Sequence, residues 1–317
     1  MPKKSSSAPV KPLVDIALDG YRWTDLQNPT FAALDQLKRR HPSFQETDLR
    51  DCLPPFQRPK LIERDDYLFA VLLFPVYDRD TGIIKSTEID FFVGRDFAVT
   101  SHAPELKIVA DAASRAGRDA GFRSERLAGS PGRLLDMLLH DLVAYCFPML
   151  THLSADIDAI EAGLFKDADD GVIREILRVK TNIANFRKIM QGHSAVLRKL
   201  LERAPRFFEP GSLAGNYRDL ADHLNEIWDA LENYKDAIDA LHESHISLVT
   251  YRTSRTSERL AALALVILPT TLMATIFSMR AENVPFLGHG KDFWLMLGVV
   301  LTVMFSTAAL LKSKKWL

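Results

Sequence analysis

Side chains that could line an aqueous path recur along one segment near the carboxyl end of this 317-residue chain. They are small or carry a hydroxyl group, and steps of three and four residues place them on one face of an α-helix. This stripe consists of Ser254, Ser257, Ala261, Ala264, Leu268, Thr271, Thr275 and Ser278. Two interpretations fit it: close packing against another helix in lipid, or the wall of a narrow pore with Leu260 or Leu268 as an apolar constriction.

Other kinds of reactive site are not evident in the sequence. It has no Gly-rich phosphate loop, no His/Cys metal cluster and no Ser or Cys nucleophile motif, so we expect no enzyme and no prosthetic group. Cys52 and Cys146 lack ligand spacing and are expected to be reduced thiols. The formal net charge of −1 predicts no nucleic-acid partner. His245 is more readily interpreted as a packed histidine than as a metal ligand.

The stripe enters one of two uncharged runs, each about 30 Å long as a helix, which is the thickness of a bilayer core. We predict a first transmembrane helix at 260–279, an external loop at 280–292, a second transmembrane helix at 293–311 and a basic tail at 312–317. Basic residues flank the pair on the outer sides: Arg252, Arg255, Arg259, Lys312, Lys314 and Lys315. This bias predicts a bacterial cytoplasmic membrane protein with both termini in the cytosol. The hairpin is either an anchor or one subunit of an oligomeric pore.

The residues before the hairpin predict a soluble part that consists of an α/β domain and a stalk of helices. Residues 1–12 are expected to be disordered and 13–125 to form a cytosolic α/β domain. Its predicted elements are a capped helix at 30–40, with Asn28 or Thr30 as the cap, a buried strand at 66–77, and strands at 88–93 and 97–102 around a tight turn. No apolar core follows the first residues, so we expect no signal peptide.

Residues 131–259 predict a stalk of long helices. One helical stretch covers 134–165 with an interruption at Pro148, another covers 172–203, and 216–268 contains neither Gly nor Pro. On this last segment apolar positions recur every 3.5 residues, which predicts packing along one seam: Leu220, Leu224, Ile227, Leu231, Tyr234, Ile238, Leu241, His245 and Leu248. The fold class is therefore an α+β membrane protein in which stalk and first membrane helix are continuous.

Several segments resemble one known family. Residues 267–285, ILPTTLMATIFSMRAENVP, are similar to the first membrane helix and signature loop of the CorA-type metal ion transporters. Further segments resemble the family in the same order: QRPK at 57–60, DYLF at 66–69, FVGRDF at 92–97, YRD at 217–219 and KSKKW at 312–316. The resemblance covers nearly the whole chain.

The resemblance implies a funnel-shaped homopentamer in the lipid bilayer that carries divalent cations, mainly Mg²⁺, with zinc, cobalt or nickel in some branches. It implies that the first membrane helix lines the pore through Ser254, Ser257, Leu260, Leu268 and Thr271. It also implies that Asp219 binds a regulatory cytosolic cation between subunits, with Asp78 as its partner. From the residues alone, both carboxylates are equally interpretable as solvated surface groups.

The sequence departs from the family at the pore entrance. The signature Gly-Met-Asn reads Ser278, Met279 and Arg280, so a carbonyl acceptor is replaced by a permanent positive charge. Glu282 could offset that charge. Three outcomes follow: a divalent cation transporter of altered selectivity, as in a zinc-transporting branch, a path of other preference such as anions, or a non-conducting relative that acts as a membrane-tethered sensor or scaffold.

Overall fold

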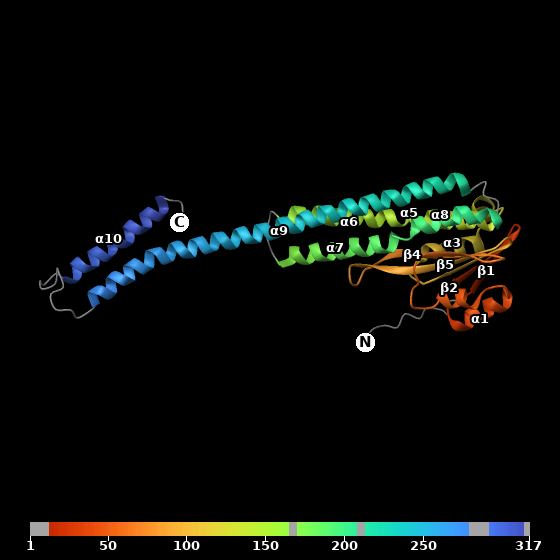
Figure 1. Ribbon diagram of the computed structural model, residues 1–317, viewed down its shortest axis with the longest axis horizontal. Helices are drawn as coiled ribbons and strands as arrows, with labels where there is room; N and C mark the ends of the chain where they lie inside the picture. The colour runs from red at the N-terminus through yellow and green to blue at the C-terminus, as the bar shows by residue number, and fades with distance from the viewer. Residues whose placement is uncertain (1–12, 165–169, 208–212, 279–291, 314–317) are drawn as a thin grey trace. The chain divides into compact units, whose positions relative to one another are not determined.

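The computed structural model describes residues 13–164, 170–207, 213–278 and 292–313. The chain forms two compact units, Met1–His242 and Glu243–Leu317. The first contains a sheet and most of the helices, and the second contains the later part of helix α9 and helix α10 (Figure 1). The predicted disordered tail at 1–12 lies outside the described residues.

Six strands form one mixed sheet in the order β1-β2-β6-β5-β4-β3. Strand β2 runs parallel to β6, and the other neighbouring pairs are antiparallel. The bounds are β1 Leu13–Leu18, β2 Tyr21–Gln27, β3 Lys60–Glu63, β4 Leu68–Asp78, β5 Ile83–Val93 and β6 Phe97–His102.

The three predicted strands are present as β4, β5 and β6. The turn between β5 and β6 requires glycine, because a Cβ at Gly94 would lie 2.3 Å from the Phe97 ring. Strand β5 begins at Ile83, five residues before the predicted start. This part of the strand pairs only with β4 and contains the polar residues Lys85 and Ser86, so the sequence shows no apolar strand pattern there.

Helices cover both faces of the sheet. On one face lie α1 (Phe31–Arg40) and α2 (Glu46–Asp51), which enclose an aromatic core in which Phe44 and Phe92 stack at 4.6 Å. The predicted helix at 30–40 is confirmed as α1, and Thr30 is its cap, accepting a hydrogen bond from the N–H of Ala33. The short segments α3 (Lys107–Arg118), α4 (Ala120–Phe122) and η1 (Arg123–Leu127) follow the sheet.

The predicted helical stalk is present, with two breaks that differ from prediction. Helices α5 (Pro131–Ala144) and α6 (Cys146–Leu164) meet at Tyr145, three residues before Pro148, because a proline in the first turn of α6 costs no helical hydrogen bond. The segment predicted as one helix at 172–203 is two, α7 (Asp170–Met190) and α8 (His193–Arg203), followed by η2 (Ala204–Arg206). Gly192 marks that break, since a Cβ there would lie 2.6 Å from the Pro59 side chain.

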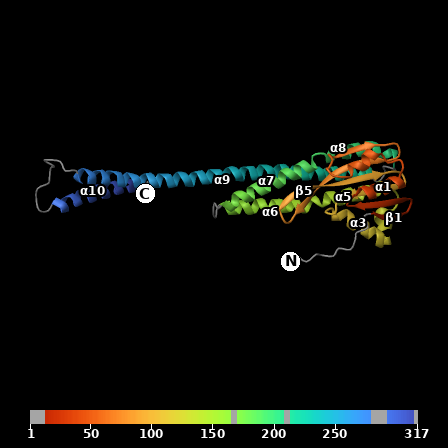
Figure 2. The same cartoon turned by 90° about the horizontal axis from the view of Figure 1, so that it is seen from below.

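Helix α9 runs from Leu213 to Ser278 and α10 from Asp292 to Ser313. Every predicted seam position of α9 from Leu220 to Leu248 is buried or half-buried, so the seam is confirmed. Within the first unit, α9 packs on α6 and α7: the Phe147 and His223 rings meet edge to face at 5.7 Å, and Lys180 pairs with Asp239 at 2.7 Å. Figure 2 shows α6 and α7 beside this part of α9.

Amide side chains of α7 hold the free end of β5. The buried Asn182 accepts a hydrogen bond from the N–H of Ile84 (2.8 Å) and donates one to the carbonyl of Gly82 (2.9 Å). Asn185 donates to the carbonyl of Ile84 at 2.9 Å. Helix α7 therefore satisfies backbone groups that would otherwise lack a strand partner.

We expect Asn182→Ala to destabilise the protein by about 1–3 kcal/mol, because it leaves the buried N–H of Ile84 and the half-buried carbonyl of Gly82 without partners. The melting temperature of the full-length protein in detergent, followed by circular dichroism, should fall. Asn185→Ala removes one bond at a half-buried position and is the matched control, with a smaller decrease. An equal melting temperature for Asn182→Ala and the wild type would contradict this role.

Two acidic side chains of β5, Glu88 and Asp90, lie inside the fold without an ion-pair partner among the described residues. Glu88 is 6% exposed and accepts a hydrogen bond from the N–H of Gln57. Burial, reinforced by the negative charge of Asp51, raises the pKa of Glu88 to about 7. Burial also raises the pKa of Asp90 well above its ordinary value.

The pKa of Glu88 is higher in the folded than in the unfolded chain, so its contribution is intact below about pH 4.5 and is lost as pH rises through about 7. Glu88→Gln cannot ionise. Its stability relative to the wild type should therefore increase by about 1–3 kcal/mol between pH 5 and pH 8. Melting temperatures at the two pH values measure this. The exposed Glu46→Gln is the control and should show no such trend; a parallel shift in both variants would contradict the assignment.

Candidate functional site

Three helical segments of the described chain are long and apolar enough to cross a membrane. In Pro131–Leu164, which comprises α5 and α6, 61% of the most apolar stretch is buried inside the fold. For Asn216–Ile276 and Met296–Ser313 the buried shares are 6% and 0%. The first segment is therefore core, whereas the other two expose apolar surface that requires a non-aqueous environment.

The second unit consists of the later part of α9 and of α10, which runs back in the opposite direction (Figure 1). It exposes many large apolar side chains, among them Trp294 near the start of α10, which is 71% exposed. The hydroxyl groups of Thr302 and Thr307 donate to carbonyls of their own helix, at 2.7 and 2.9 Å, and so need no external acceptor. Both features suit a helix surrounded by lipid.

The predicted stripe lies on α9. Seven of its residues share one face and are exposed in the single chain: Ser254, Ser257, Ala261, Ala264, Leu268, Thr271 and Thr275. Leu260 is 63% exposed and borders this face, and Leu268 is 66% exposed. Ser278 is the last residue of α9, but its side chain lies outside the described part of the structure. Met279, Arg280 and Glu282 also lie outside the described residues.

The hydroxyl groups of the threonines of the stripe can accept hydrogen bonds from outside the helix but cannot donate them. The Thr271 hydroxyl donates to the carbonyl of Ile267 at 2.8 Å, and the Thr275 hydroxyl donates to the carbonyl of Thr271 at 2.7 Å. A hydroxyl has a single hydrogen, so each oxygen remains free to accept but not to donate. The exposed face of α9 therefore offers hydrogen-bond acceptors at these two positions.

Pro269 adds a further acceptor to this face. It lies inside α9 and has no N–H, so the carbonyl of Leu265 loses its helical donor. Positions 261, 265 and 268 lie on the same side of the helix, which places this carbonyl beside the stripe. An unsatisfied carbonyl in hydrocarbon costs several kcal/mol, whereas water satisfies it.

Asp78 ends β4 and is already engaged by the protein. Its carboxylate contacts Nζ of Lys85 and accepts a hydrogen bond from the N–H of Asp80 at 3.0 Å. The hydrogen bond from Lys85, followed by those from Thr81 and the Asp80 N–H, lowers the pKa of Asp78 to about 2. The group is therefore a carboxylate at any physiological pH.

Asp219 lies in a different part of the fold, near the start of α9. It lines a hollow of about 450 Å³ with residues of η1 and α5, among them Asp136 and His140. Asn216 donates to the Asp136 carboxylate at 2.7 Å, which links α9 to α5. The structure thus brings Asp219 close to Asp136, a residue that the sequence did not single out, and not to Asp78.

No group of three or more His, Cys, Asp or Glu side chains in the described part of the chain is placed to hold a metal ion. His245 is buried, in agreement with a packed histidine, and neither ring nitrogen has a hydrogen-bond partner among the described residues. Cys52 and Cys146 are free thiols, and both are buried.

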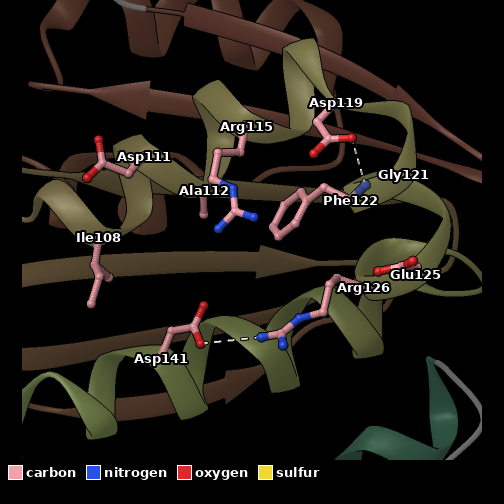
Figure 3. Close-up of a pocket in the computed structure, with 10 residues that line it drawn as sticks. All are labelled: Ile108, Asp111, Ala112, Arg115, Asp119, Gly121, Phe122, Glu125, Arg126 and Asp141. Atoms are coloured by element: carbon pink, nitrogen blue, oxygen red, sulfur yellow. Dashed lines mark hydrogen bonds and ion pairs between the residues drawn. The ribbon is translucent and has the colours of Figure 1, made fainter.

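Another hollow, of about 550 Å³, lies between α3, η1 and α5 (Figure 3). Arg126 pairs with Asp141 at 3.5 Å, and the guanidinium of Arg115 lies 4.6 Å from the centre of the Phe122 ring. Its lining carries four carboxylates and two cations, and both cations are engaged by the protein itself.

Comparison with known proteins places these features in a family. Residues 19–313 match the family described as CorA-like Mg²⁺ transporter protein. The cobalt/magnesium transport protein CorA of Thermotoga maritima is 24% identical over 269 residues, which are 85% of this chain and 76% of that protein. The putative metal ion transporter YfjQ of Bacillus subtilis is 22% identical over 294 residues, 93% of this chain and 89% of its own.

The solved structure of the CorA magnesium transporter from Methanocaldococcus jannaschii has the same fold. The TM-score is 0.82 at 16% sequence identity, over 98% of this chain and all of that one. Both have an α/β domain, a long helix and a C-terminal helix, as the sequence predicted. Because the family match spans residues 19–313, this chain belongs to the CorA-like Mg²⁺ transporter family.

Proposed function

We propose that copies of this chain, five by the family resemblance, enclose a pore through which divalent metal cations cross the bacterial cytoplasmic membrane. Mg²⁺ is the first candidate substrate, and zinc, cobalt and nickel are the alternatives. The observation that carries the proposal is the exposed acceptor stripe on α9, a helix apolar and long enough to span a bilayer. A single pair of spans cannot enclose a pore, so the function requires a ring of subunits.

The chemistry of the stripe favours cations over anions. A hydrated divalent cation directs its water hydrogens outward and is stabilised by acceptor oxygens. Thr271, Thr275 and the freed carbonyl of Leu265 are such acceptors, since both hydroxyl hydrogens are used within the helix. An anion would need donors instead. Leu268 would form an apolar constriction within the same stripe.

Charges beside the spans support an orientation with both ends of the hairpin in the cytosol. Arg252, Arg255 and Arg259 precede the first span on α9, and Lys312 follows the second on α10. Their positions follow the positive-inside bias.

We further propose that a cytosolic cation bound between neighbouring subunits at Asp219 and Asp78 holds the pore closed. Both are ionisable carboxylates from separate parts of one chain, so a shared cation would have to join two copies. Carboxylates that face each other across an interface repel unless a cation lies between them, and cation loss would therefore favour an open state. Lys85 would have to release Asp78 for this to occur.

A second candidate is a non-conducting relative that serves as a membrane-tethered sensor or scaffold. Arg280 favours it, because its positive charge replaces the family's Asn at the entrance. A ring of such charges would repel divalent cations unless Glu282 or other carboxylates offset it.

The pore assignment is tested by Mg²⁺ uptake into liposomes that contain the full-length protein and a fluorescent reporter. Thr271→Val keeps the shape of the side chain but removes the acceptor oxygen, and we expect uptake to fall about tenfold. Thr270→Val is the matched control: its hydroxyl also donates to a carbonyl of α9, that of Val266 at 2.7 Å, but it lies off the stripe and should leave uptake within about twofold.

Equal uptake by the Thr270→Val and Thr271→Val variants would contradict the assignment of the stripe as the pore wall. In the same assay, no uptake by the native protein but clear uptake by Arg280→Asn would establish the non-conducting candidate instead.

The gating proposal predicts that Asp219→Ala increases flux when Mg²⁺ inside the liposomes is high, because the cation that closes the pore loses a ligand. We expect about a tenfold increase at high internal Mg²⁺ and little change when it is low. Asp222→Ala, an exposed carboxylate three residues further along α9, should behave like the native protein. Unchanged flux in Asp219→Ala at high internal Mg²⁺ would rule out its regulatory role.

A further inference from the structure

A hollow of about 670 Å³ lies where the β4–β5 hairpin meets the corner between α7 and α8. Its size falls within the range of small-molecule sites in proteins. Three cationic side chains line it, from three separate segments: Arg58 before β3, Lys85 on β5 and Lys188 in the last turn of α7. None of its lining residues carries a carboxylate.

These cations are poorly neutralised by the protein. Within the described residues, Arg58 and Lys188 take part in no ion pair, and Lys85 pairs with Asp78, which does not line the hollow. Arg58 and Lys188 thus bring two like charges without a carboxylate partner to one cavity, and a bound anion removes their repulsion. The charge pattern therefore selects an anionic ligand.

Uncharged donors face the same space. Gln191 and Gly192 line the hollow at the start of α8, an 11-residue helix whose first turn has no side-chain cap. The Gln191 side-chain amide and the uncapped helix start that follows Gly192 suit the oxygens of a phosphate group.

Close packing at the α7–α8 corner fixes the position of the segment that carries Arg58. Gly192 approaches the Pro59 side chain so closely that a Cβ at 192 would lie 2.6 Å from it. The segment that carries Arg58 is therefore seated directly on the α7–α8 corner that carries Lys188. Cations distant in sequence are thus fixed around one cavity.

The remaining walls are apolar: Pro59, Leu73, Ile84 and Ile189. A simple inorganic anion would leave them in contact with water, whereas a ligand with a ring or hydrocarbon portion would cover them. We propose that this hollow binds a phosphorylated small organic anion of the nucleoside phosphate class. The cations and the start of α8 would hold the phosphates, and the apolar walls would cover the organic part. This inference is independent of the proposed transport.

The test is calorimetric titration of the full-length protein in detergent with ATP, in EDTA so that free divalent cations play no part. We expect binding that weakens about tenfold in Arg58→Gln and in Lys188→Gln, since each removes one charged contact to phosphate. Lys199→Gln, at an exposed position of α8 that does not line the hollow, should change affinity less than twofold. All three residues are exposed, so the variants should fold, which circular dichroism verifies.

Inorganic phosphate and adenosine are titrated in parallel and should each bind at least tenfold more weakly than ATP. Phosphate that binds as tightly as ATP would overturn the organic part of the proposal. No ATP binding by the native protein, or an equal loss of affinity in Lys199→Gln and Lys188→Gln, would overturn the site itself.

Discussion

The structure depends on a run of backbone hydrogen bonds in α9 that continues from its seam into its apolar span, as far as Pro269. Between Asn216 and Leu268 this helix contains neither Gly nor Pro, so nothing in the sequence breaks it between the seam and the apolar span. In the first unit its seam is buried by side-chain packing, and in the second unit it includes an exposed apolar stretch long enough to cross a membrane. Apart from the Leu265 carbonyl that Pro269 leaves free, the backbone of α9 thus satisfies its own polar groups in both settings, which is the condition for entering lipid.

Sequence reasoning succeeded where local pattern determines structure. The apolar run of β4, the tight turn at Gly94 and the 3.5-residue seam of α9 each leave a periodic or steric signature in adjacent residues. It failed where a distant contact decides. Gly192, at the break between α7 and α8, packs closely against Pro59, 133 positions earlier, and the early start of β5 is supported by α7.

In the candidate site, too, local features could be predicted from the sequence and contacts between distant segments could not. The stripe on α9 could be read from spacing alone, because helical geometry fixes which residues share a face. The neighbours of Asp219 could not, since Asp136 belongs to another helix and only the packed fold brings them together. The basic hollow was also missed, as Arg58, Lys85 and Lys188 come from separate segments with no common motif.

The amide bridges from α7 to β5 also bear on how the protein behaves at high concentration. Residues 83–88 of β5 have no strand on the β6 side of the described sheet, and such an edge can recruit a strand from another molecule. Asn182 and Asn185 occupy backbone groups along this edge. A helix thereby does what charged or proline residues do in other sheets: it blocks edge-to-edge aggregation without extending the sheet.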